Sequence, residues 1–157
     1  GRYPRTSIME MPFVAESSES ASKALWAMLP NLLAEDYRDF KPIALHCHNP
    51  GLFHTRDKSL KTIADVKGLR MRAPNPPTQA LLAYLGATPV GMPVPQVPEA
   101  LSRGVIDGAM IPWEVVPAVR VHELAKHHTE TDPKLPALYI SSFIFAMNQA
   151  RYAALPR

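Results

Sequence analysis

The sequence predicts an α/β fold with a largely parallel sheet, and three observations support this prediction. Short apolar runs typical of strands alternate with segments of helical spacing. Glycines follow several of these segments, where helix ends favour them. The 17 prolines recur beside apolar runs as boundaries between many short elements, and they form no single tract.

Composition limits the classes of function. The 157 residues, 46% of them hydrophobic, suffice for one ordinary core or two small lobes. The net charge is only +3 and no basic run exceeds two residues, so we expect no nucleic-acid partner. The single cysteine, Cys47, excludes an internal disulfide and a cysteine-rich zinc site. No apolar stretch reaches the ~20 residues of a membrane span.

The first third of the chain predicts a buried segment, a helix and a strand. Residues 7–14 form the short buried segment. Residues 17–40 carry apolar side chains at helical spacing behind capping serines, and Pro30 should kink or split that helix. Residues 43–48 form a strand that an Asn-Pro-Gly turn ends.

The middle third predicts a denser alternation. Thr62 and Asp65 resemble a capping box for one helical turn, and Gly68 follows as its C-terminal residue. Further strands are expected at residues 69–73, from residue 88 and at 105–107, with helices at 78–85 and 99–102. Because ligands bind at the carboxyl ends of parallel strands, we expect a binding crevice there.

Arg72 is the first candidate binding residue, because it lies at the carboxyl end of the 69–73 strand. A guanidinium offers a planar fork of donors that matches a carboxylate. The alternative is a surface arginine beside Arg70. His54 and Arg56 follow the Pro-Gly turn and could line the same crevice, or form a solvated loop. Trp113 could cover an apolar ligand or pack in the core.

Histidines suggest a metal, but their spacing does not support one. His46, His48 and His54 have no acidic or second cysteine partner at suggestive spacing, so we expect no metal and no cofactor. His122 and His127 lie five residues apart, about 500° around a helix, whereas a zincin needs histidines four apart. We expect them to be exposed polar residues.

Three ordered motifs resemble one known family. Residues 63–74, IADVKGLRMRAP, resemble the "DLKGLKxRxP" signature of TRAP-type (tripartite ATP-independent periplasmic) solute-binding proteins, the DctP-like family. Residues 85–93, LGATPVGMP, are similar to its "LGAxPVPM", and residues 99–108, EALSRGVIDG, to its "EVYxALQxGVVDG". The two ends also fit, so the resemblance covers essentially the whole chain.

The resemblance implies a periplasmic-binding-protein-like fold of two lobes joined by a hinge. Such a protein is not an enzyme: it captures a small organic acid in the periplasm and delivers it to membrane permease subunits. Family members usually exceed 300 residues, so both ends look truncated, and we expect a signal peptide in the full-length protein. By analogy, residues 1–54 are part of lobe I, 55–148 form lobe II, and 149–157 begin the return to lobe I.

The resemblance also implies roles for particular residues. Arg72 matches the family's carboxylate-clamping arginine, and Arg56 matches a second ligand-contacting arginine, though at shorter spacing to Arg72. The family's Asn-Pro after its "DG" strand is Ile111-Pro112 here, followed by Trp113. This change favours an apolar or aromatic monocarboxylate over a sugar acid. The expected ligand-binding residues are Arg72, Arg56, His54, Trp113, Met110 and Phe143.

Two other functions stay open at this point. One is a zinc-dependent hydrolase that uses His46, His48 and His54. The other is a ligand-sensing domain of similar fold, which would signal and not transport.

Overall fold

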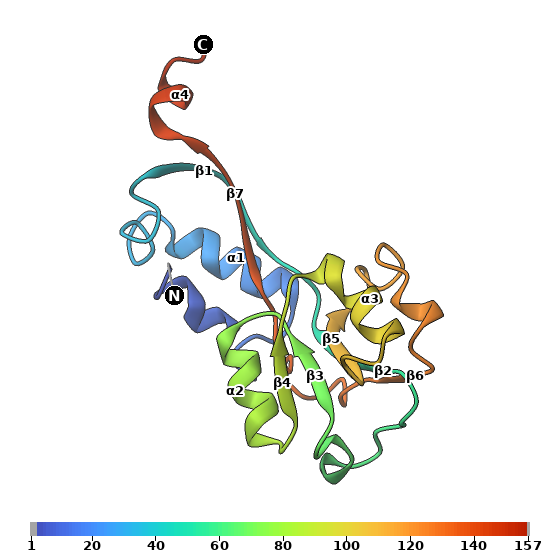
Figure 1. Cartoon of the computed structure of the whole chain (residues 1–157). Helices are drawn as coiled ribbons and strands as arrows, with labels where there is room; N and C mark the ends of the chain where they lie inside the picture. The colour runs from blue at the N-terminus through green and yellow to red at the C-terminus, as the bar shows by residue number, and fades with distance from the viewer. Residues whose placement is uncertain (1–2, 157) are drawn as a thin grey trace.

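The computed structural model describes residues 3–156, which form two sheets with helices packed against them (Figure 1). Strands β1 (Phe40–Cys47) and β7 (Ser142–Asn148) make an antiparallel pair. This pair runs away from the rest of the molecule and carries α4 (Gln149–Ala153) at its far end. The second sheet has the order β4-β3-β5-β2-β6. Its strands are β2 (Gly51–Thr55), β3 (Arg70–Ala73), β4 (Thr88–Gly91), β5 (Gly108–Pro112) and β6 (His127–Thr129).

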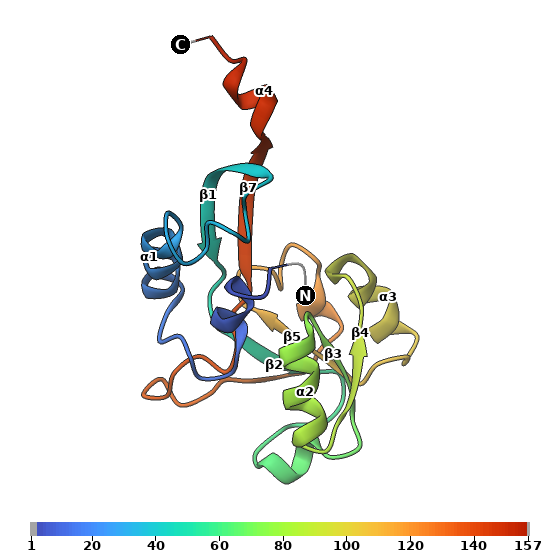
Figure 2. The same ribbon diagram turned by 90° about the vertical axis from the view of Figure 1, so that its left-hand side faces the viewer.

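Helix α1 (Ser18–Met28) covers the two-stranded sheet, as the turned view in Figure 2 also shows. Ser17 caps it by accepting a hydrogen bond from the Ser20 N–H at 3.1 Å. The predicted helix over 17–40 is real but shorter, because Pro30 cannot donate to the helix. Residues 29–39 are turns. Leu25 is buried beside Leu45 of β1 in the core of this half.

The prediction of a buried segment over 7–14 is wrong. The first short 3-10 helix, η1 (Thr6–Glu10), is held by polar contacts. The Thr6 hydroxyl bonds to Asp36 at 2.9 Å and to Tyr37 at 2.8 Å. The apolar side chains at its end are about half exposed, 51% at Met11 and 50% at Phe13.

The five-stranded sheet is mixed, so the prediction of a largely parallel sheet is wrong for half of its pairings. Strand β3 runs parallel to β4 and β5, whereas β2 runs antiparallel to β5 and β6. Helix α2 (Pro76–Tyr84) buries Leu82 on one face of the sheet, and α3 (Val97–Ser102) buries Leu101 on the other. The predicted α/β class is confirmed.

One strand is displaced from its predicted position. Residues 105–107 are not a strand; β5 begins at Gly108, where the prediction ended. The Asp107 carboxylate accepts bonds from the Arg70 N–H at 2.8 Å and from its guanidinium at 2.6 Å, which fixes this turn. Gly108 can then pair closely, since a Cβ there would lie 2.6 Å from the His54 carbonyl oxygen. The other short 3-10 helices are η2 (Ile63–Val66), η3 (Val94–Gln96) and η4 (Val121–Glu123).

The chain crosses between the two sheets twice, at residues 48–50 and 139–141, which we call the crossing segments. The His48 N–H donates to the Ser141 carbonyl at 3.3 Å, which joins the two segments, and the N–H of Gly51, the first residue of β2, donates to the Tyr139 carbonyl at 3.0 Å. The pairing thus puts residues 51–55 in the five-stranded sheet and residues 142–148 in the two-stranded sheet. Strand β2 pairs with β5 and β6, and β7 pairs with β1. Within residues 3–156, no helix is long and apolar enough to cross a membrane.

Candidate ligand-binding cavity

A cavity of about 600 Å³ lies between the two sheets, and the crossing segments form part of its wall. Residues of both sheets and of both crossing segments contribute to it. The lining residues are Glu10, Ser18, His46, Cys47, His48, Asn49, Arg72, Pro74, Asn75, Val94, Pro112, Glu114, Val115, Tyr139, Ser141 and Phe143. Of the six residues expected to bind ligand, the structure brings Arg72 and Phe143 to this cavity.

Arg72 is a buried cation without an anionic partner. Its side chain extends from β3, and the residue is 4% exposed. Nε donates to the Met92 carbonyl and Nη1 to the Met110 carbonyl, both at 3.0 Å. Among residues 3–156, no carboxylate lies within ion-pair distance of it. Burial lowers the pKa of this guanidinium, which expresses the cost of holding the charge away from water. A bound anion would offset that cost.

Tyr139 is the second unusual polar group of the cavity, and sequence reasoning missed it. The residue is 1% exposed, and its hydroxyl is the one buried side-chain polar atom in the described chain without a hydrogen-bond partner. Burial raises the pKa of the hydroxyl, and the nearby Arg72 charge opposes that rise. The phenol therefore stays protonated at neutral pH and can donate to a group placed beside Arg72.

Aromatic rings form one side of the cavity. The Phe143 ring stacks on the His46 ring with centroids 5.5 Å apart. The His48 ring lies edge-on to Tyr139 at 5.4 Å and tilted against Phe143 at 6.0 Å. Such a wall presents apolar, polarisable faces that suit a flat ligand body.

His48 is held as a neutral ring. Nε2 accepts from the Ser141 N–H at 3.0 Å, and Nδ1 bonds to the Asn49 carbonyl, which only an N–H can do. Burial lowers its pKa, and the carbonyl of Asn49 and the carboxylates of Glu114 and Glu10 oppose that effect. His48 therefore gives the cavity shape and no positive charge.

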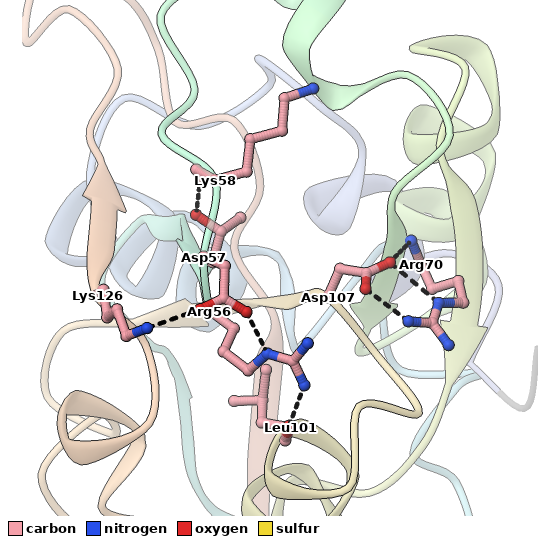
Figure 3. A network of polar contacts seen from close by, with 8 residues as sticks. Arg56, Asp57, Lys58, Arg70, Leu101, Asp107 and Lys126 are labelled. Atoms are coloured by element: carbon pink, nitrogen blue, oxygen red, sulfur yellow. Dashed lines mark hydrogen bonds and ion pairs between the residues drawn. The ribbon is translucent and has the colours of Figure 1, made fainter.

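Arg56 lies at the opposite edge of the sheet from Arg72. Because β2 runs antiparallel to β5, the carboxyl end of β2 meets the amino ends of β3 and β5. Figure 3 shows Arg56 there, donating to Asp57 at 2.6 Å and to the Leu101 carbonyl at 3.1 Å. The Arg70–Asp107 pair lies on the same side in that view. The structure does not bring Arg56 to the cavity, because its strand points the other way.

Three further expected binding residues also lie elsewhere. His54 is fully buried, with Nε2 donating to the Ile111 carbonyl at 2.9 Å and Nδ1 bonded to His128 at 2.7 Å. Trp113 is 40% exposed, lies edge-on to His54 and donates to Glu130 at 2.6 Å. The Met110 side chain belongs to the core, and only its carbonyl reaches the site, where it orients Arg72.

The metal-site alternative finds no geometric support in the described residues. His54 uses both nitrogens within the five-stranded sheet, whereas His46 and His48 line the cavity. Among residues 3–156, no three His, Cys, Asp or Glu side chains are placed to hold one metal ion. Burial raises the pKa of the Cys47 thiol to about 11, so no thiolate is present at neutral pH.

Three histidines with lowered pKa values predict a pH dependence of stability. Burial is the main cause of a lowered pKa in His48, His54 and His128. In the unfolded chain these rings titrate near ~6.5, so below that pH the unfolded state binds more protons. The free energy of unfolding should therefore be greatest above pH ~6.5 and fall as pH drops toward the folded pKa values.

Urea unfolding of the whole protein at a series of pH values between about 7.5 and 5.5 measures this effect. Carboxylates whose pKa is lowered, such as Asp57 and Asp107, lose their contribution only at more acidic pH. The variant His54→Gln should show a shallower pH dependence than the wild type. A free energy of unfolding that is constant or rises on acidification in this window would contradict the argument.

Comparison with known proteins identifies the family of this chain. The family model for bacterial extracellular solute-binding proteins, family 7 (DctP), matches residues 1–157. A TRAP solute-binding protein from Rhodoferax ferrireducens, solved with copurified benzoate, is 51% identical with a TM-score of 0.96. The match covers 99% of this chain and 48% of that chain.

Two further solved structures are also similar to this chain. A marine metagenome TRAP protein specific for aromatic acids, solved with 3-hydroxybenzoate, is 45% identical with a TM-score of 0.95, covering 99% of this chain and 48% of that one. A Bordetella bronchiseptica TRAP protein with bound mandelate is 29% identical with a TM-score of 0.88, covering 100% of this chain and 50% of that one. This chain thus spans about half the length of these relatives. It belongs to family 7 of the bacterial extracellular solute-binding proteins, the DctP family.

Proposed function

We propose that this protein is a periplasmic solute-binding protein that captures an aromatic or other apolar monocarboxylate for the permease subunits of a TRAP-type transporter. The observation that carries this proposal is the buried, unpaired guanidinium of Arg72 in the cavity wall. Capture is binding without a chemical step, so no catalytic group is needed. The lobe division, the site residues, the permease partner and the location of this protein are parts of the same proposal.

The free donors of Arg72 fit a carboxylate. A guanidinium carries five N–H donors, of which two bond to the Met92 and Met110 carbonyls. The remaining donors suit the two oxygens of one ligand carboxylate, and the Tyr139 hydroxyl can donate a further bond. The burial of Arg72 lowers the local dielectric and so strengthens this ion pair.

The rest of the wall suits an aromatic body. Phe143, His46 and the neutral His48 supply ring faces, and Pro112 and Val115 add apolar surface. A sugar acid would need hydroxyl partners over its whole body, whereas most of the exposed wall surface is apolar. The bound benzoate, 3-hydroxybenzoate and mandelate of the three similar proteins support the same ligand class.

Calorimetry on the whole protein, freed of copurified ligand by unfolding and refolding, tests the proposal. We expect benzoate, 3-hydroxybenzoate and mandelate to bind, and galacturonate to bind at least a hundredfold more weakly. Preference for the sugar acid would refute the proposed ligand class.

Replacing Tyr139 by phenylalanine should weaken benzoate binding about tenfold or more, because a hydrogen bond to a charged group contributes about 1.5–3 kcal/mol. Stability without ligand should not fall, since the hydroxyl has no partner to lose. Tyr37→Phe is the matched control: its hydroxyl bonds to Thr6 at 2.8 Å and lies outside the cavity lining. The control should lose stability and keep affinity. Unchanged affinity in Tyr139→Phe would remove this residue from the site.

A further inference from the structure

Two carboxylates line the same cavity as Arg72. Glu10 comes from η1 in one lobe, and Glu114 follows β5 in the other. Among the lining residues, all of them within the described chain, Arg72 is the one lysine or arginine. With both lining histidines, His46 and His48, counted as neutral, the lining carries one formal positive charge against two negative charges. The wall thus carries a net negative charge, whereas a site that binds acids is expected to carry a net positive charge.

Neither carboxylate is neutralised by a cation. Glu10 Oε1 accepts from the Ser142 N–H and hydroxyl, both at 2.9 Å, and Oε2 accepts from Asn75 at 3.1 Å. Glu114 Oε1 accepts from the Asn49 N–H at 2.8 Å. All these donors are neutral groups, so the hydrogen bonds fix the two carboxylates without cancelling their charge.

Both carboxylates belong to the cavity lining and lie near the ring of His48. Their fields both act on the ring of His48, which itself lines the cavity between the aromatic side chains. A ligand whose carboxylate pairs with Arg72 uses the single positive charge. A second anionic group on that ligand would meet the like charges of Glu10 and Glu114 in a cavity that is only partly open to solvent.

We propose that Glu10 and Glu114 restrict the cavity to ligands with a single negative charge, and thereby exclude aromatic dicarboxylates. This inference rests on the proposed function, and it goes beyond it by assigning the discrimination to two residues. Specificity arises here from a repulsive element that acts against the wrong ligand, in addition to the attraction of Arg72.

A pair of isosteric ligands isolates the effect of charge. Isophthalate and 3-nitrobenzoate have the same ring, the same substitution pattern and planar substituents of nearly the same size, but the nitro group is neutral. We expect the whole wild-type protein to bind 3-nitrobenzoate at least about tenfold more tightly than isophthalate in calorimetry.

Variants that remove the charge of each carboxylate test whether Glu10 and Glu114 cause this ratio of affinities. Glu10→Gln and Glu114→Gln should each lower the ratio of the two affinities about threefold or more, and the double variant should lower it further. Glu99→Gln removes the same charge from a surface pair with Arg103 at 3.1 Å, and it should leave the ratio unchanged. Using a ratio cancels any general loss of binding-competent protein. If Glu10→Gln does not fold, the exposed Glu114 still provides the test.

The outcomes separate the two proposals. If benzoate binds and isophthalate binds as tightly as 3-nitrobenzoate, the selectivity inference is wrong and the proposed function stands. The selectivity inference is equally wrong if neither glutamine variant changes the ratio. If neither benzoate nor 3-nitrobenzoate binds, the proposed function is wrong and the inference falls with it. A wild-type ratio that falls only in the Glu10 and Glu114 variants supports the inference.

Discussion

Replacing Arg72 by alanine is expected to lower benzoate affinity by roughly a hundred- to several-thousand-fold. Removing one partner of a buried ion pair costs about 3–5 kcal/mol, because the other charge stays buried and unpaired. Here the unpaired group would be the ligand carboxylate, in a cavity whose remaining formal charges are those of Glu10 and Glu114. The loss should therefore lie toward the upper end of that range.

Two further variants make this measurement specific. Arg72→Lys keeps the charge but cannot hold the Met92 and Met110 carbonyls and a two-oxygen ligand together, so its affinity should be intermediate. Arg56→Ala removes an arginine at the other edge of the sheet and should keep wild-type affinity. Calorimetry with benzoate measures all three. A large loss in Arg56→Ala with little change in Arg72→Ala would exchange the roles of the two arginines.

Replacing Gly51 by alanine is expected to cost both stability and affinity. A Cβ at this position would lie 1.9 Å from Cε1 and 2.1 Å from Cζ of Tyr139. The ring is 1% exposed and belongs to the core, so it cannot give way without disturbing its neighbours. Overpacking of this kind costs about 1–3 kcal/mol or more, which should lower the melting temperature by several degrees. The displaced hydroxyl would also leave its position near Arg72.

A double variant tests whether the Tyr139 ring is the cause. Replacing Tyr139 by leucine as well removes the atoms that clash, so Gly51→Ala/Tyr139→Leu should be more stable than the sum of the two single effects. Thermal melts of the four proteins give this coupling. Additive effects, or a Gly51→Ala protein that melts with the wild type, would show that the backbone moves freely at this point.

The sequence predicted the helices and strands more accurately than it predicted which residues line the cavity. The capping box at Thr62 is real in its main contact, because the Asp65 carboxylate accepts from the Thr62 N–H at 2.8 Å. Arg72 was found because a strand and its carboxyl end can be recognised from a short local pattern. These features depend on neighbours in sequence, which a single chain displays directly.

The expectations for Arg56 and His54 depended on the direction of β2, which no local pattern encodes. All five residues of β2 are buried, so no alternation showed which face His54 would occupy. Arg56 was proposed from its place after a turn and from a family match, and neither shows to which end of the sheet the antiparallel β2 carries it. Tyr139 was missed for a related reason: its position near Arg72 depends on a crossing segment that follows β6 by about ten residues.

The crossing segments link the angle between the two sheets to whether a ligand fills the cavity. Within residues 3–156 they are the two covalent links between the sheets. Their residues His48, Asn49, Tyr139 and Ser141 also line the cavity. A rotation between the sheets must therefore reshape the wall, and a bound acid that fits one shape favours one angle by its differential affinity. By the same linkage, a partner that recognises that angle on the outer surface would bind more tightly when the cavity is filled.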